Sequence, residues 1–182
     1  MKIGRFWRTV RHLNADQWRY RLIRRGQQYI AWLTPDIWSR RIDYLCHRLP
    51  IGDPTRKNLN VIADQILAFQ AAAYGPKLDE MALGQFTFLG ETVNFGGIDK
   101  IDWRRCSGGK NNLLWRLNLG YMGYTVPWLA NGNLLDLDRT AGLVRSLQEQ
   151  NLWNSPGVFK DIWNPYTVSH RLINLLTGLN LY

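Results

Sequence analysis

The sequence predicts a mainly α-helical protein that forms an incomplete α/α toroid, with a short irregular or extended segment near residues 84–110. Apolar residues recur with helical spacing in successive segments, and short links rich in glycine and proline separate these segments. The composition is 46% hydrophobic, which is normal for a globular protein and argues against general disorder. The 182 residues are enough for one domain with a core, or for part of a larger domain.

The first third of the chain carries the whole excess of positive charge. Residues 1–60 contain 13 Lys and Arg against 4 Asp and Glu, whereas residues 61–182 contain 10 of each kind. A basic patch favours an anionic partner, which could be nucleic acid, acidic lipid or acidic polysaccharide. The alternative is a solvated basic helix face with no partner.

We expect residues 1–52 to form a basic helical arm. Asn14 is a suitable N-cap, and Trp18, Leu22 and Tyr29 fall on one side of the helix that follows it, with arginines elsewhere. Such an amphipathic helix could lie on a surface. A second short helix is expected to start after Thr34.

A linker follows the arm, because proline and glycine cluster at residues 50–54. We expect a second domain, the partial toroid, over residues 53–182. Its first helix is favoured by three consecutive alanines and ends at Gly75 and Pro76. The apolar stripe of this helix contains Leu59, Ile62, Ile66, Phe69 and Ala73.

The segment from residue 84 to residue 110 is expected to be irregular, with one short hairpin. Phe86, Phe88 and Val93 lie in stretches rich in aromatic and β-branched residues, and glycines surround these stretches. Extended chain and turns therefore replace helix in this part of the sequence.

Three further helices are predicted after residue 110. The first ends or kinks near Pro127, and the third starts with Asn164 as N-cap and Pro165 at the first helical position. Because the chain stops at Tyr182 on an amphipathic helix, we expect the toroid to be incomplete. The three apolar stripes are Leu114, Leu117, Tyr121 and Tyr124; then Leu137, Ala141, Val144 and Leu147; and last Val168, Leu172, Leu175 and Leu179.

Polar side chains gather on the last predicted helix. Tyr166, His170 and Asn174 follow one another at intervals of four residues, and Arg171 lies three residues before Asn174, so these side chains are neighbours. We expect them to form a stripe opposite the apolar stripe and to line a groove. The alternative is an ordinary polar helix face with satisfied hydrogen bonds.

A second polar and aromatic group is predicted on the helix that precedes Pro127. It contains Trp115, Arg116, Asn118 and Tyr121. A guanidinium and an amide can hold a carboxylate, and flat aromatic faces can support sugar rings. Core packing is the alternative for Trp115.

Common catalytic and metal-binding motifs do not occur in the sequence. There is no GxSxG, GxxxxGK[ST] or GxGxxG. Cys46 and Cys106 form no CxxC pair and have no histidine at ligand spacing. We interpret His12 and His47, which lie in basic surroundings, as structural or solvated. No metal and no cofactor are expected.

Three motifs resemble a known family when they are taken in order. Phe-Thr-Phe-Leu at residues 86–89 leads to Trp103, Leu-Leu-Trp-Arg-Leu-Asn-Leu-Gly-Tyr-Met-Gly-Tyr follows at 113–124, and Trp-Asn-Pro-Tyr-Thr-Val-Ser-His-Arg-Leu-Ile-Asn comes at 163–174. Together they resemble the N-terminal helical domain of the heparinase II/III-like polysaccharide lyases. The opening segments Arg-Thr-Val-Arg-His-Leu at 8–13 and Gln-Trp-Arg-Tyr-Arg at 17–21 also look like bacterial members of that group without a secretion signal.

The resemblance implies an α/α toroid that is followed, in the full-length family, by a β-sandwich. Such lyases cleave acidic, uronate-containing polysaccharides by β-elimination: a base removes the proton next to the uronate carboxylate while another group stabilises the charge. We expect the region with the catalytic Asn, Tyr and His, and the β-sandwich, to be missing from this chain, so no catalytic residue is transferred and we expect a truncated chain that is inactive alone. The part that matches implies one wall of the substrate cleft, formed by Trp163, Tyr166, Arg171 and Asn174, with Asn118 and Tyr121 as additional candidates.

A second function class stays open beside the lyase. The chain could be a non-enzymatic glycan-binding or scaffold module in exopolysaccharide or capsule biosynthesis. In either class the expected partner is an acidic polysaccharide or oligosaccharide, with the missing C-terminal part or a second chain as a further partner. Nucleic acid is not expected as a partner, because no recognised nucleic-acid-binding pattern occurs, and a membrane surface is less favoured.

The compartment is predicted from the N-terminus. It is basic but lacks the apolar region of a secretion signal, and no stretch of about 18 uncharged apolar residues occurs. We therefore expect a cytoplasmic protein.

Overall fold

A computed structural model describes residues 14–48, 60–104, 112–152 and 155–182, and these residues are mainly α-helical, as their periodicity predicts. The chain divides into two compact units, Met1–Leu49 and Pro50–Tyr182. The expected linker at residues 50–54 lies outside the described residues. None of the described helices is both long enough and apolar enough to cross a membrane.

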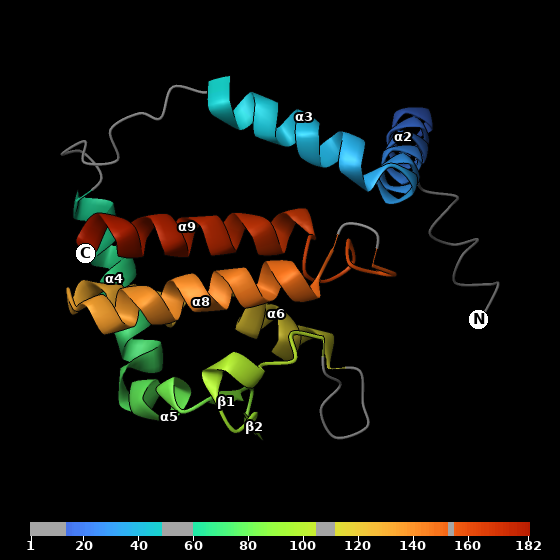
Figure 1. Cartoon of the computed structure of the whole chain (residues 1–182). Coiled ribbons are helices and arrows are strands. Elements are labelled where there is room, and N and C mark those ends of the chain that lie inside the picture. Colours follow the sequence, from blue (N-terminus) through green and yellow to red (C-terminus); the bar gives the residue numbers. More distant parts are fainter. Residues whose placement is uncertain (1–13, 49–59, 105–111, 153–154) are drawn as a thin grey trace. The chain divides into compact units, whose positions relative to one another are not determined.

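The described residues of the first unit form two helices, α2 (Ala15–Leu33) and α3 (Pro35–Arg48) (Figure 1). Asn14 caps α2 as predicted, since its side-chain oxygen accepts a hydrogen bond from the N–H of Gln17 at 2.9 Å. Thr34 closes the last turn of α2 through its N–H and its hydroxyl, and Pro35 then opens α3. No residue of α2 is buried.

In the second unit, the described residues combine helices with a hairpin (Figure 1). Its elements are α4 (Asn60–Tyr74), the 3₁₀ turn η2 (Gly75–Lys77), α5 (Leu78–Ala82), β1 (Gln85–Phe88), β2 (Glu91–Asn94), the 3₁₀ turn η3 (Ile98–Lys100), α6 (Leu113–Tyr121), α7 (Thr125–Ala130), α8 (Leu134–Gln150) and α9 (Pro165–Leu181). Asparagine side chains cap α6, α8 and α9, each accepting a hydrogen bond from an N–H of the first turn.

The predicted hairpin is confirmed and consists of β1 and β2. Phe88 pairs with Glu91, so only Leu89 and Gly90 form the turn. Both turn residues have positive φ, 56° and 77°, which is the backbone of the two-residue turns that suit the twist of a hairpin. Phe86 and Phe88 of β1 are buried and enter the core.

The break between α6 and α7 differs from the prediction. The expected helix through residue 126 ends earlier, at Met122, whose left-handed φ of 55° terminates α6. Pro127 lies in the first turn of α7, where a backbone N–H has no partner within the helix and proline is tolerated. The proline is therefore accommodated in the first turn of a helix and does not end one.

The centre of the second unit is the short helix α7. Its first five residues are buried, and it packs against α4, α8 and α9. Aromatic side chains from several elements meet beside it: the ring of Tyr124 lies 5.2 Å from that of Phe86 and 5.4 Å from that of Trp128. Trp115 is buried as well and lies 5.3 Å from Phe88. The core is thus aromatic, and core packing is the outcome for Trp115 and Tyr124.

The predicted apolar stripes of α4 and α6 are wrong about which face is buried. Ile62 and Phe69 of α4 are exposed, and Phe69 is 71% exposed, whereas Ala63 is buried. Leu114 of α6 is exposed, and the buried side of that helix contains Trp115, Arg116, Leu119 and Gly120. Leu59 lies outside the described residues. In α8 the stripe is partly confirmed, since Leu147 is buried and Ala141 is exposed.

Helix α9 turns part of its predicted polar face inward. Its buried residues are Thr167, Arg171, Asn174, Thr177 and Gly178. Leu172 and Leu179, which were expected in the core, are each about half exposed. Gly178 allows the close approach of α7, because a Cβ at this position would lie 2.6 Å from Leu129 Cδ1. The buried face of α9 is therefore largely polar, although Leu175 packs against the core.

Candidate functional site

The Trp-Asn-Pro-Tyr motif at residues 163–166 forms the start of α9. Asn164 caps the helix by accepting a hydrogen bond from the N–H of Tyr166 at 2.9 Å, and Pro165 follows the cap. Trp163 is half-buried and donates its indole N–H to the carbonyl oxygen of Asn151 at 2.7 Å. The motif therefore fixes the direction in which α9 leaves the preceding turn.

Arg171, on the buried face of α9, hydrogen-bonds to backbone carbonyl groups of the same chain. Its Nε donates to the carbonyl oxygen of Gly120 at 2.8 Å, and one of its terminal nitrogens donates to that of Ile162 at 3.1 Å. The guanidinium carbon lies 5.5 Å from the ring centre of Trp163. Gly120 is in the last turn of α6, where carbonyl groups lack helical partners and a positive charge is favourable.

Asn174 connects three helices from its position on α9. Its side-chain nitrogen donates to the carbonyl oxygen of Tyr121 on α6 at 2.8 Å. Its side-chain oxygen accepts a hydrogen bond from Gln70 of α4 at 3.0 Å. Like Arg171, Asn174 is buried. The structure thus places these two predicted binding residues inside the protein, with their polar groups bonded to it.

The charge of Arg171 is retained in this buried position. Burial lowers the pKa of its guanidinium to about 10, while the neighbouring Tyr124 acts in the opposite direction. This pKa still lies well above neutral pH, so the side chain is positive there. The second unit therefore holds a fixed cation beneath the N-terminal half of α9.

Three ring side chains lie together on the outer side of the α6–α9 contact, and we call them the tyrosine–histidine cluster: Tyr121, Tyr166 and His170. The imidazole of His170 lies 4.4 Å from the ring of Tyr166 and 4.9 Å from that of Tyr121, measured between ring centres. The two tyrosine rings are 6.0 Å apart. Tyr166 is 61% exposed, and the other two side chains are half-buried. Burial, and then the proximity of Tyr166, raise the pKa of Tyr121.

Asn118, the remaining predicted residue, is bonded within its own helix. Its side-chain nitrogen donates to the carbonyl oxygen of Leu114, one turn earlier in α6, at 2.9 Å. It precedes Tyr121 by three residues, so both side chains lie on the same side of α6. The structure thus brings Tyr121 and Tyr166 together at the surface and leaves Asn118 at the edge of this group.

A buried ionic group was not predicted from the sequence. The carboxylate of Asp161 lies 3.4 Å from Nε of Arg104 and 3.4 Å from a terminal nitrogen of Arg116. The same nitrogen of Arg116 also donates to the carbonyl oxygen of Arg104 at 3.0 Å. Arg116 was expected to be able to hold a carboxylate, and the carboxylate that it holds belongs to this chain. The sequence had pointed to Arg116 as a residue that can hold a carboxylate, but no sequence spacing linked Arg116 to Asp161.

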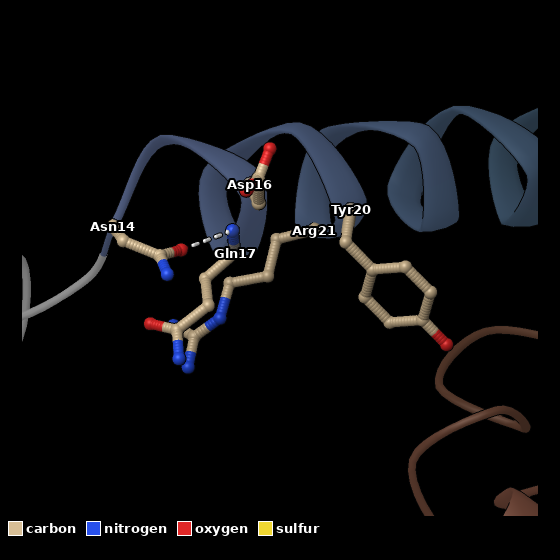
Figure 2. A pocket seen from close by; sticks show the side chains of 5 residues that line it. All are labelled: Asn14, Asp16, Gln17, Tyr20 and Arg21. Carbon is tan, nitrogen blue, oxygen red and sulfur yellow. Dashed lines mark hydrogen bonds between the residues drawn. The ribbon is translucent and has the colours of Figure 1, made fainter.

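The following hollows in the described part of the chain lie outside the tyrosine–histidine cluster. A hollow of about 390 Å³ lies at the start of α2, and Figure 2 shows that its lining side chains, from Asn14 to Arg21, all come from one helix end. Two apolar grooves flank α9: one of about 260 Å³ toward α4, which includes Ile62 and Ile173, and one of about 450 Å³ toward α8, which includes Leu175. These grooves offer apolar contact and few polar groups.

Metal-binding side chains are not clustered in the described part of the chain. No group of three or more His, Cys, Asp or Glu side chains there could hold a metal ion. Cys106 lies outside the described residues. The tyrosine–histidine cluster offers hydroxyl groups, an imidazole and flat ring faces.

Comparisons with protein-family models, with curated proteins and with solved structures found no match for the chain in any of the three. The likeness to the heparinase II/III-like lyases thus depends on the sequence motifs alone.

Proposed function

We propose that the chain is the N-terminal helical part of a heparinase II/III-like protein and that it contributes a binding surface for acidic polysaccharide. The observation that carries the proposal is the tyrosine–histidine cluster. All three of its members, Tyr121, Tyr166 and His170, belong to the motifs that prompted the resemblance, and they come from two separate helices. The toroid, of which α4 and α6–α9 would form a part, belongs to the same proposal.

The cluster suits a sugar ring because of its chemistry. Tyrosine presents an apolar face together with a polar hydroxyl, and a pyranose ring likewise has an apolar face and polar edges. His170 adds an imidazole that can donate or accept a hydrogen bond. Such a combination of aromatic faces with a few polar groups is typical of ligand-binding surfaces.

The acidic nature of the proposed ligand comes from the family resemblance, because the lyases that the motifs resemble cleave uronate-containing polysaccharides, and the buried positive charge of Arg171 is compatible with it. This residue is adjacent to His170 in α9, and it stays positive because its pKa of about 10 lies above neutral pH. A cation fixed in a partly desolvated position attracts an anion more strongly than a cation in water does. A uronate carboxylate near the cluster would therefore be favoured over a neutral sugar.

A binding role is favoured over a catalytic role for this chain alone. β-Elimination requires a base and a group that stabilises the uronate carboxylate. Arg171 and Asn174, the groups best suited to a carboxylate, already bond to Gly120, Ile162, Tyr121 and Gln70. In the proposal, the residues for catalysis would come from a further segment or a second chain.

The non-enzymatic alternative draws on the same observation. A glycan-binding or scaffold module for exopolysaccharide or capsule biosynthesis needs the cluster but no base. Elimination produces an unsaturated uronate that absorbs ultraviolet light, so an assay with the purified chain separates the two classes. A measurable rate would contradict our proposal that the chain has no catalytic centre of its own.

Titration calorimetry with polygalacturonate, and with the neutral polymer dextran as comparison, tests the binding proposal. Tyr166→Ala and His170→Ala should each weaken polygalacturonate binding about tenfold or more, because a ring contact at the centre of a binding surface is lost. Phe69→Ala is the matched control, since Phe69 is a more exposed ring on α4 outside the cluster. Absence of binding by the folded wild-type chain, or equal effects of all three variants, would contradict the proposal.

A further inference from the structure

The first unit has a surface that the proposed function does not use. Helix α2 contains no buried residue, although one of its faces is apolar. Trp18, Leu22, Tyr29 and Leu33 follow one another at helical spacing along this face. Leu22, Tyr29 and Leu33 are each more than half exposed, so the described residues leave this face largely uncovered.

Positive charge accompanies the apolar face along the same helix. Within α2 there are four arginines and one acidic residue, Asp16. The ion pairs found among the described residues involve Arg104, Arg116 and Arg139, all of them in the second unit. Arg24 contacts the ring and the hydroxyl of Tyr20, which does not neutralise its charge.

Helix α3 repeats this combination. Ile42 and Leu45 are exposed apolar side chains, and Arg40, Arg41 and Arg48 are exposed in the same helix. The guanidinium of Arg48 lies over the ring of Tyr44, 4.4 Å from its centre. Both helices of the unit are therefore amphipathic, basic and rich in aromatic residues.

We propose that α2, together with α3, docks on the surface of an anionic lipid bilayer. A helix with leucine, tryptophan and tyrosine along one face, and with arginines on and beside that face, lies in the plane of a membrane interface with its apolar side chains among the acyl chains. The arginines meet the lipid phosphates, and the amphipathic rings of Trp and Tyr fit the headgroup level. The helix rests on the membrane, since none of the described helices is apolar enough to span it.

A membrane explains both the exposed apolar side chains and the arginines of α2, whereas other anionic partners explain only the arginines. Nucleic acid and acidic polysaccharide attract arginine through phosphate or carboxylate groups. Neither offers an acyl phase for Leu22, Ile30 and Leu33. Lipid binding should therefore depend on the leucines and on the arginines, while binding to a polyanion should depend on the arginines alone.

Vesicle flotation with the full chain tests the proposal, using phosphatidylcholine vesicles with and without phosphatidylglycerol. We expect binding only to the vesicles that contain phosphatidylglycerol. Leu22→Ser combined with Leu33→Ser should weaken this binding about tenfold or more, because two apolar side chains no longer leave water. Arg24→Gln and Arg25→Gln should each weaken it about fivefold.

The matched control is Leu134→Ser combined with Leu135→Ser, which removes two equally exposed leucines from α8 in the second unit. It should float like the wild-type chain, and circular dichroism should show that all variants keep their helix content. Failure of the wild-type chain to float with anionic vesicles would overturn the proposal. So would an equal loss in the control, or vesicle binding that ignores the leucine variant and responds only to charge, as a polyanion site does.

Discussion

Helices α2 and α9 both carry an apolar stripe and a polar stripe. They differ in which of these stripes is buried. Helix α2 buries neither stripe within the described residues. Helix α9 buries the polar one, through Arg171 and Asn174, and leaves Leu172 and Leu176 about half exposed. The comparison shows that an apolar stripe identifies a helix but does not by itself identify the face that packs.

The difference comes from what each helix packs against. Helix α9 meets the end of α6, where the carbonyl groups of Gly120 and Tyr121 need donors, and Arg171 and Asn174 supply them. A buried carbonyl without a donor costs more than an exposed leucine does. The need of the α6 carbonyl groups for hydrogen-bond donors therefore decides which face of α9 is buried. Helix α2 has no such neighbour among the described residues of its unit.

The largest loss of stability is expected from Arg171→Ala. The variant leaves the carbonyl groups of Gly120 and Ile162 without donors in a buried place, so the free energy of unfolding should fall by about 3 kcal/mol. Urea denaturation followed by circular dichroism measures this change. Arg145→Ala, at an exposed position of α8, is the control and should change the value by less than about 0.5 kcal/mol. Equal free energies of unfolding for the two variants would show that Arg171 does not stabilise the fold.

A smaller loss is expected from Asn174→Ala. It removes one hydrogen bond to the backbone of Tyr121 and one to Gln70, which should lower the free energy of unfolding by about 2 kcal/mol. Asn174→Asp sharpens the test, because a carboxylate has no donor for the Tyr121 carbonyl oxygen but still accepts from Gln70. A stability equal to that of the wild type in both variants would contradict the network described here.

The smallest effect is expected on the outer face of α9. Leu172→Ser and Leu176→Ser should each change the free energy of unfolding by no more than about 0.5 kcal/mol, since both side chains are about half exposed or more. The same urea titration provides the measurement. A loss as large as that of Asn174→Ala would mean that the outer face is covered in solution, and the contrast with α2 would then disappear.

Local signals predicted the elements of the fold well. The N-caps Asn14 and Asn164, the end of α4 before Gly75 and the hairpin near Phe86 all depend on residues close in sequence, and the structure confirms each of them. The expected end near Pro127 was wrong because a left-handed residue, Met122, ends α6 first. Methionine as a residue type does not predict that left-handed conformation.

The candidate site was predictable only in part, since its geometry depends on contacts between distant segments. Tyr121 and Tyr166 were each selected by helical spacing, and the structure brings them together with His170. The inward direction of Arg171 could not be read from α9, because it depends on carbonyl groups about 50 residues away in sequence, at the end of α6. The pairing of Arg116 with Asp161 was missed for the same reason.

The most direct test of the account measures binding and stability on one pair of variants, Tyr166→Ala and Arg171→Ala. We predict that Tyr166→Ala loses polygalacturonate binding by about tenfold or more while its urea midpoint stays at the wild-type value. Arg171→Ala should lower the midpoint strongly. Unchanged polygalacturonate binding in Tyr166→Ala, or a midpoint that falls as far as that of Arg171→Ala, would contradict a glycan-binding role for the tyrosine–histidine cluster.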